Sequence, residues 1–100
     1  MKVLWRKSAV ESLVELDEWR KGIELETIAE YIMSTVNLYF NQQYFSIHIP
    51  GRQVIIQEIP VELRMVLIAV GKSDPYKVFY RIYEERIEIF LVSHPYQKPL

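Results

Sequence analysis

Cationic and aromatic side chains alternate near the end of the sequence, where they could contact a partner. Lys77, Phe79 and Arg81 take every second position of one run, and Glu88 and Phe90 do so in the next. Because side chains alternate along a β-strand, each set would lie on one face of its strand. Exposed aromatic rings on a sheet face often mark a protein interface. The chemistry that these residues predict is therefore contact with a partner or target.

The two runs are predicted to pair as a β-hairpin over residues 75–93, with its turn at residues 83–86. One side then pairs opposite charges and aromatic rings across the strands. Those pairs are Lys77 with Val92, Phe79 with Phe90, and Arg81 with Glu88. The other side is apolar and is expected to be core. Its pairs are Val78 with Leu91, Tyr80 with Ile89, and Ile82 with Ile87.

The sequence indicates no metal or cofactor site. The chain has two histidines, His48 and His94, no cysteine, and no carboxylates spaced as metal ligands. His48 is predicted to be a loop residue, and Glu84 and Glu85 a solvated turn. A phosphate-binding glycine loop and a nucleophile elbow are both missing from the sequence, so no cofactor is expected.

Composition favours a small cytoplasmic protein of one domain, residues 1–100. The formal net charge is −1, from 12 Lys and Arg residues against 13 Asp and Glu residues. A protein that coats nucleic acid is normally clearly basic. The longest apolar run, residues 65–70, is far shorter than a membrane span, and the N-terminus lacks the pattern of a signal peptide. We therefore expect no membrane contact.

Two helices are predicted in the first half of the chain. The first is expected over about residues 8–21, because Ser8 and Glu11 match a capping box. Gly22 would end it in a left-handed conformation. The second is expected from residue 24 to residues 41–44, folding back on the first as an antiparallel pair. The inward-facing side of the first helix is predicted to comprise Ala9, Val10, Leu13, Val14, Leu16 and Trp19.

Strands are predicted at residues 2–5, 53–59 and 62–70, besides the two of the hairpin. Pro60 separates the second from the third, since proline cannot donate to a sheet ladder. An N-terminal strand, a helix pair and then an antiparallel sheet of three to four strands make an α+β fold. The helix pair would cover one face of the sheet, and the other face would be left for a partner.

The ordered set of these segments resembles the RelE/ParE superfamily, the toxins of bacterial toxin–antitoxin pairs. The first strand and helix pair are followed by Pro50-Gly51-Arg52 and Glu62-Leu63-Arg64. The most specific segments are residues 75–82, Pro-Tyr-Lys-Val-Phe-Tyr-Arg-Ile, and residues 87–94, Ile-Glu-Ile-Phe-Leu-Val-Ser-His. The family's penultimate strand commonly reads Tyr-Arg-Ile-x-Tyr-x-Ile. This chain departs from the family at Lys77, where Arg is usual, which keeps the charge but loses the guanidinium fork.

The resemblance implies one of two activities. ParE-like members act on DNA gyrase by protein contact, and RelE-like members cleave messenger RNA within the ribosome. The near-neutral charge favours the first: a ParE-like toxin of a type II toxin–antitoxin system, neutralised by a cognate antitoxin. The antitoxin would lay a helix or an added strand on the open sheet face and the helix pair. The residues expected to bind a partner are Arg64, Phe79, Arg81 and Phe90.

Two alternatives stay open at this point. In a RelE-like, ribosome-dependent endoribonuclease, the resemblance places Lys77, His94 and Tyr96 in the catalytic set. Such cleavage needs cations to stabilise the phosphate and acid or base groups to move protons. The third reading is a non-toxic protein-binding domain that retains the fold. A homodimer is compatible with all three.

Overall fold

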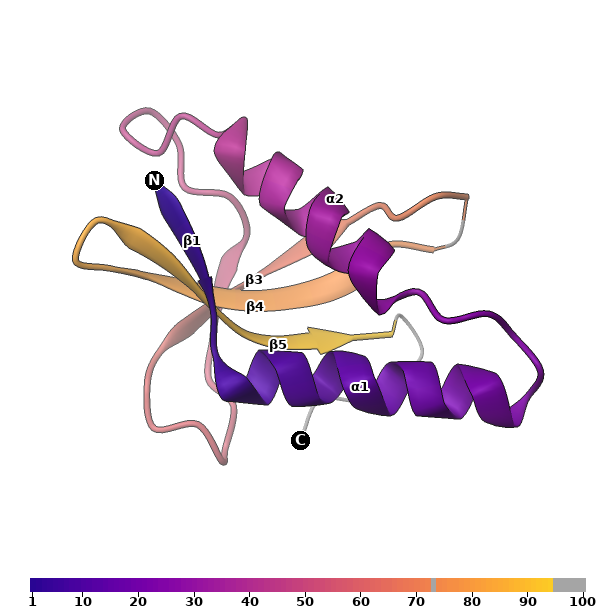
Figure 1. The fold of residues 1–100 in the computed structure, drawn as a ribbon. Helices are drawn as coiled ribbons and strands as arrows, with labels where there is room; N and C mark the ends of the chain where they lie inside the picture. The colour runs from indigo at the N-terminus through magenta and orange to yellow at the C-terminus, as the bar shows by residue number, and fades with distance from the viewer. Residues whose placement is uncertain (73, 95–100) are drawn as a thin grey trace.

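The computed structural model describes residues 1–72 and 74–94. It confirms the α+β class, with two helices and a five-stranded mixed sheet in the order β1-β5-β4-β3-β2 (Figure 1). The elements are β1 (Lys2–Trp5), α1 (Lys7–Gly22), α2 (Ala29–Asn41), β2 (Arg52–Val54), β3 (Leu63–Ile68), β4 (Tyr76–Tyr83) and β5 (Arg86–Ser93). Strands β2 to β5 are antiparallel as predicted. The first strand adds a fifth, parallel to β5, so the sheet is mixed.

The β4–β5 hairpin is confirmed, with its turn at residues 84–85. Both turn glutamates have positive φ angles, 50° and 63°, as a two-residue type I′ turn requires. From this turn as far as the pair Tyr80 and Ile89, the register is the predicted one. A β-bulge between Phe79 and Tyr80 then shifts it by one residue, so that Phe79 lies opposite Leu91. The predicted pairing of Phe79 with Phe90 is therefore wrong.

The bulge changes which side chains of β5 reach the core. Val78 lies opposite Val92, and Lys77 lies opposite Ser93. Val92 is buried on the helix side, whereas Leu91 packs on the other face of the sheet. One extra residue in a strand moves the following side chains to the opposite face. The prediction that Leu91 belongs to the helix-side core is thus wrong. The other five residues predicted for that face do lie in the helix-side core.

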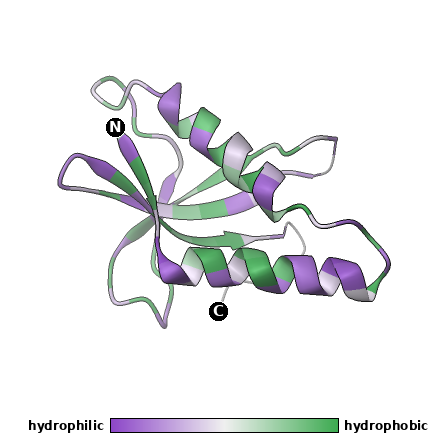
Figure 2. Cartoon of the chain, viewed as in Figure 1, coloured by the Kyte–Doolittle hydropathy of each residue, from purple (hydrophilic) through white to green (hydrophobic). Residues whose placement is uncertain are grey.

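The main core lies between the sheet and the helices, which run in roughly opposite senses and diverge away from their connection (Figure 1). Its helical residues are Ala9, Leu13, Leu16, Ile32, Val36 and Phe40. The predicted inward side of α1 is too wide, because Val10, Val14 and Trp19 are 42%, 51% and 52% exposed. Figure 2 shows the resulting hydrophobic colour on the outer side of the first half of α1.

Helix α1 also covers an edge of the sheet. Strand β1 pairs with β5 from Arg86 to Ile89, and beyond Ile89 no other strand of the described residues pairs with that edge of β5. The Ser8 hydroxyl donates to the carbonyl of Phe90 at 2.6 Å, and the Ser12 hydroxyl accepts from the amide of Val92 at 3.2 Å. The predicted capping box is therefore wrong, because the helix begins at Lys7 without a side-chain cap. The Ser8 hydroxyl instead bonds to the edge of β5.

The second helix begins five residues later than predicted. Glu24 adopts a left-handed conformation, with φ of 62°, so the chain is not helical where the second helix was expected to start. The structure assigns this left-handed position to Glu24, whereas the prediction gave it to Gly22. Asp17 of α1 then accepts hydrogen bonds from the amides of Ile28 and Ala29, at 2.7 and 3.1 Å. A side chain from α1 thus caps the start of α2.

Replacing Asp17 with Ala is expected to lower the free energy of unfolding by about 1 kcal/mol, the usual loss for a removed N-cap acceptor. D17N retains an oxygen acceptor and should recover part of that loss. E18A, at the next position on the exposed side of α1, is the control and should change stability by less than about 0.5 kcal/mol. Urea denaturation of the three variants measures the difference. Equal losses in D17A and E18A would contradict the cap.

Candidate functional site

The sheet face opposite the helices carries the residues predicted to bind a partner, but it is partly covered. Phe79 and Phe90 are only 3% and 7% exposed. They form a second core with Ile56 and Leu63, and Ile56 comes from the loop that follows β2. Strand β2 ends at Val54 instead of residue 59, and the chain beyond it folds over this face. The expectation that both phenylalanine rings are exposed is therefore wrong.

Next to this second core, three arginines converge on one carboxylate. Glu88 is fully buried, and it accepts hydrogen bonds from Arg81, Arg86 and Arg6. The Nε atom of Arg81 lies 2.6 Å from Oε1. The Oε2 atom accepts from Nη2 of Arg86 at 3.1 Å and from Nη1 of Arg6 at 3.4 Å. We call Arg6, Arg81, Arg86 and Glu88 the arginine cluster.

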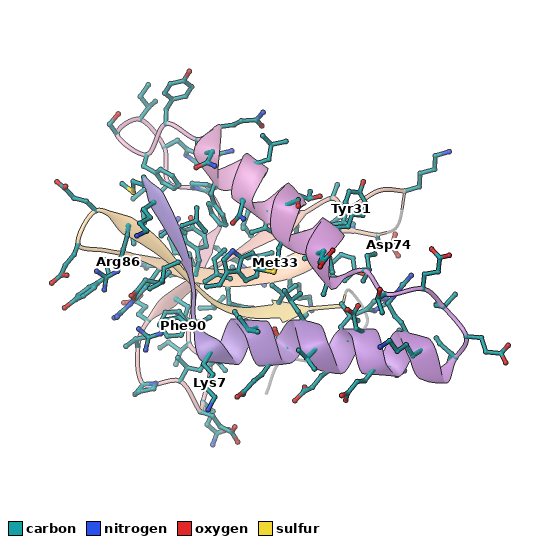
Figure 3. All side chains as sticks on the ribbon, viewed as in Figure 1. Lys7, Tyr31, Met33, Asp74, Arg86 and Phe90 are labelled. Carbon is teal, nitrogen blue, oxygen red and sulfur yellow. The ribbon has the colours of Figure 1, made fainter. Side chains whose placement is uncertain are left out.

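The sheet brings the cluster together from three places in the sequence. Arg81 and Glu88 are cross-strand partners, as predicted. Arg86 precedes Glu88 by two positions and so shares its face of β5. Arg6 follows β1 directly, and its amide donates to the carbonyl of Ile89, which continues the parallel pairing. Figure 3 shows Arg86 and Phe90 at the end of the molecule where the hairpin and β1 meet.

The cluster carries an excess of positive charge on its outer side. Burial disfavours the ionised form of Glu88, but hydrogen bonds and charge from Arg81 and Arg86 outweigh this and lower the pKa of Glu88. Three guanidinium groups against the carboxylates of Glu88 and of the exposed Glu84, which lies 3.4 Å from Arg86, leave a local charge of +1. The side chains of Arg81, Arg86 and Arg6 are 24%, 34% and 45% exposed. They are thus held by an inaccessible carboxylate while part of each remains open to solvent.

Aromatic rings flank the same guanidinium groups. The Cζ atom of Arg81 lies 4.3 Å from the ring centroid of Tyr83, and that of Arg6 lies 5.1 Å from the centroid of Phe90. Tyr83 is 44% exposed. Stacking on rings restricts the arginine side chains and leaves hydrogen-bond donors for another group. The surface that results is cationic and aromatic, and the buried carboxylate of Glu88 bonds its arginines from below.

Arg64 lies apart from this cluster. It donates to the carbonyls of Ile49, Pro50 and Gly51, at 3.2, 3.2 and 2.7 Å. The hydroxyl of Tyr80 donates to the same carbonyl of Pro50, and burial raises the pKa of that hydroxyl to about 12. Arg64 therefore holds the loop before β2, and the structure does not bring it together with Arg81.

The residues of the catalytic alternative are not brought together either. Lys77 lies between Tyr76 and Val78, which are both buried on the helix side, so its side chain points to the other face. His94 lies on the helix side, with its ring 5.6 Å from that of Trp19 and 5.7 Å from that of Tyr76. Tyr96 is outside the described residues. Lys77 and His94 thus lie on opposite sides of the sheet.

Two of the cluster's arginines were missed by the sequence reasoning. Arg86 could have been found, because its spacing of two from Glu88 places both on one strand face. Arg6 gives no such local signal, since its contact with Glu88 spans 82 residues of sequence. It depends on the parallel pairing of β1 with β5, which the sequence analysis did not predict.

Within residues 1–72 and 74–94, no group of three His, Asp or Glu side chains is placed to hold a metal ion. In the same part of the chain, neither α1 nor α2 is both long and apolar enough to cross a membrane. No model of a known protein family, no curated protein and no solved structure gives a significant match to the chain.

Proposed function

We propose that this protein is the toxin of a type II toxin–antitoxin system, ParE-like in fold and action, which binds DNA gyrase by protein contact. The observation that carries the proposal is the arginine cluster, a fixed cationic and aromatic surface around a fully buried carboxylate. Arginine and tyrosine are among the residues that most often dominate the energy of protein interfaces. A cognate antitoxin would neutralise the toxin.

Two observations favour protein contact over cleavage of RNA. Lys77 and His94 lie on opposite faces of the sheet, so they do not share a site in which both could act on one phosphate. The net charge of −1 is also unsuited to holding a long stretch of nucleic acid. The element order, a strand, two helices and then four strands, follows the order of the segments that resemble the RelE/ParE superfamily, although the sheet is mixed and has five strands.

Induced expression in a bacterial host tests this function. We expect DNA replication to stop while messenger RNA stays intact, and purified protein to inhibit gyrase in a supercoiling assay. Co-expression of the small protein encoded next to this gene should restore growth. Transcripts cut after induction would overturn the proposal in favour of a ribonuclease. Full growth without that neighbour would favour a non-toxic binding domain.

The arginine cluster can be tested with two adjacent positions. R6Q removes the most exposed cation of the cluster, whereas K7Q removes a cation outside it, whose side chain is 91% exposed and is paired with Glu11. We expect R6Q to raise the concentration needed for half-inhibition of gyrase by about tenfold, as for an interface arginine worth roughly 1.4 kcal/mol. K7Q should leave it unchanged. Equal effects would show that general charge, and not the cluster, determines binding; thermal unfolding of both variants excludes a folding defect.

A further inference from the structure

A second surface of different character lies between α1 and the loop that follows β2. It is a groove of about 240 Å³. Its lining residues are Ser8, Glu11, Ser12, Glu15, Ile56, Glu58, Ile59 and Leu91. Figure 1 shows this loop beside the first turns of α1. The groove is separate from the arginine cluster, with which it shares no residue.

The floor of the groove is apolar and is built by the bulge in the hairpin. The bulge turns Leu91 to the face opposite the helices, where it packs with Ile56 and Ile59 of the loop. Ile56 is 5% exposed, while Ile59 and Leu91 are half-buried. The hydroxyls of Ser8 and Ser12 are already bonded to β5. The groove therefore offers apolar contact below and few free donors at its side.

The rim of the groove carries three carboxylates. Glu11 is paired with Lys7, at 3.8 Å. Among the described residues, the carboxylates of Glu15 and Glu58 have no hydrogen-bond or ion-pair partner. With two of the three carboxylates unpaired, the rim beside the apolar floor is negatively charged and would attract a cationic side chain. No set of three acidic or histidine side chains in the described chain is arranged to hold a metal ion, which disfavours a bare cation.

We infer that this groove binds a basic, apolar segment of a protein partner, with an aliphatic side chain on Ile59 and Leu91 and lysine or arginine at the glutamate rim. The negative charge of the rim favours a positively charged partner, and the apolar floor favours a side chain of the size of leucine. Neither toxin activity nor the arginine cluster is needed for this binding, so the two proposals can fail separately.

A fluorescein-labelled peptide with two lysines flanking a leucine is the probe, measured by fluorescence anisotropy at low and at physiological salt. We expect binding that weakens with salt and that becomes about tenfold weaker in E15Q/E58Q, since this variant removes two rim carboxylates that would pair with the lysines of the peptide. E18Q, on the exposed side of α1 outside the groove, is the matched control and should bind as the wild type does.

Three results of the binding measurements would overturn the inference. They are equal binding by E15Q/E58Q and the wild type, equal binding of a peptide with serine in place of leucine, and no binding up to about 1 mM. Methyl NMR of the wild-type protein with the peptide locates the contact. Shifts at Ile56, Ile59 and Leu91 support the groove, and shifts confined to other methyl groups refute it. None of these readouts involves gyrase, so a failed toxin proposal leaves them unaffected.

Discussion

Replacing Glu88 with Ala is expected to lower the free energy of unfolding by about 3 kcal/mol or more, because it leaves three converging guanidinium groups without their carboxylate. Removing one partner of a buried ion pair leaves uncompensated charge, and here three side chains lose that partner, although Arg86 keeps its contact with the exposed Glu84. Part of this loss comes from repulsion among the arginines. It should therefore shrink as salt is added, because the arginines remain partly exposed.

Denaturant unfolding of E88A, E88Q and E84A at low and high salt separates these contributions. E88Q keeps the volume and an oxygen acceptor, so its loss should be smaller than that of E88A. Glu84 contacts Arg86 at 3.4 Å, but its side chain is 65% exposed, so E84A should cost less than about 0.5 kcal/mol. A loss in E88A no larger than that in E84A would show that the cluster is not a stabilising centre.

The same carboxylate predicts how stability depends on pH. The pKa of Glu88 is lowered in the folded state below its ordinary value of 4.5. Between the folded and the unfolded pKa values the unfolded chain binds more protons, so stability rises with pH across that range. The contribution of Glu88 is thus complete at neutral pH and is lost as pH falls below 4.5 through the lowered pKa. E88Q cannot titrate there, and its stability should fall less steeply on acidification than that of the wild type.

The sequence predicted the parts of this fold that follow from local alternation. The hairpin, its turn and the pair of Arg81 with Glu88 depend on side chains that alternate along two neighbouring strands. The bulge beside Phe79 has no counterpart in that pattern. It moves Leu91 and Val92 to the faces opposite those expected. The apolar residues alternate regularly through this part of the sequence, and such a pattern predicts an unbroken strand pair. The shift of register at the bulge could therefore not be predicted.

Non-local contacts account for the other differences. Ser8 matches a capping box locally, yet its hydroxyl is used by a strand more than 80 residues later. Asp17 looks like a solvated helix residue, yet it caps the next helix. The burial of Phe79 and Phe90 likewise depends on a loop, since Ile56 covers them after β2 ends early. In each case the partner lies outside the window in which periodicity can be seen.

These differences also change how the candidate site is understood. The sheet face predicted to be open is divided into a covered apolar part and the arginine cluster beside it. The exposed chemistry is therefore provided by arginine donors and by Tyr83, and not by the two phenylalanine rings. A partner that contacts the arginine cluster must therefore bind mainly through charge, hydrogen bonds and stacking on Tyr83.

Gly51→Ala is expected to destabilise the protein by about 3 kcal/mol or more, because two costs coincide at this position. Gly51 has a φ of +87°, a conformation that costs an L-residue roughly 1–2 kcal/mol. A Cβ atom there would lie 2.4 Å from the carbonyl oxygen of Met65 in β3, and that oxygen belongs to backbone. Relief of the clash would move residues 49–51, whose carbonyls accept the hydrogen bonds of Arg64 and Tyr80.

Gly71 provides the matched control, since it isolates the backbone conformation from the clash. Its φ is +64°, but a Cβ atom would meet nothing closer than the ring of Tyr31 at 3.7 Å, an ordinary contact. G71A should therefore lose only about 1–2 kcal/mol, the cost of the left-handed conformation. Thermal and urea unfolding of the two variants compare them directly. If G51A is no less stable than G71A, the close approach of the loop to β3 does not exist in the folded protein, and Arg64 has no fixed loop to hold.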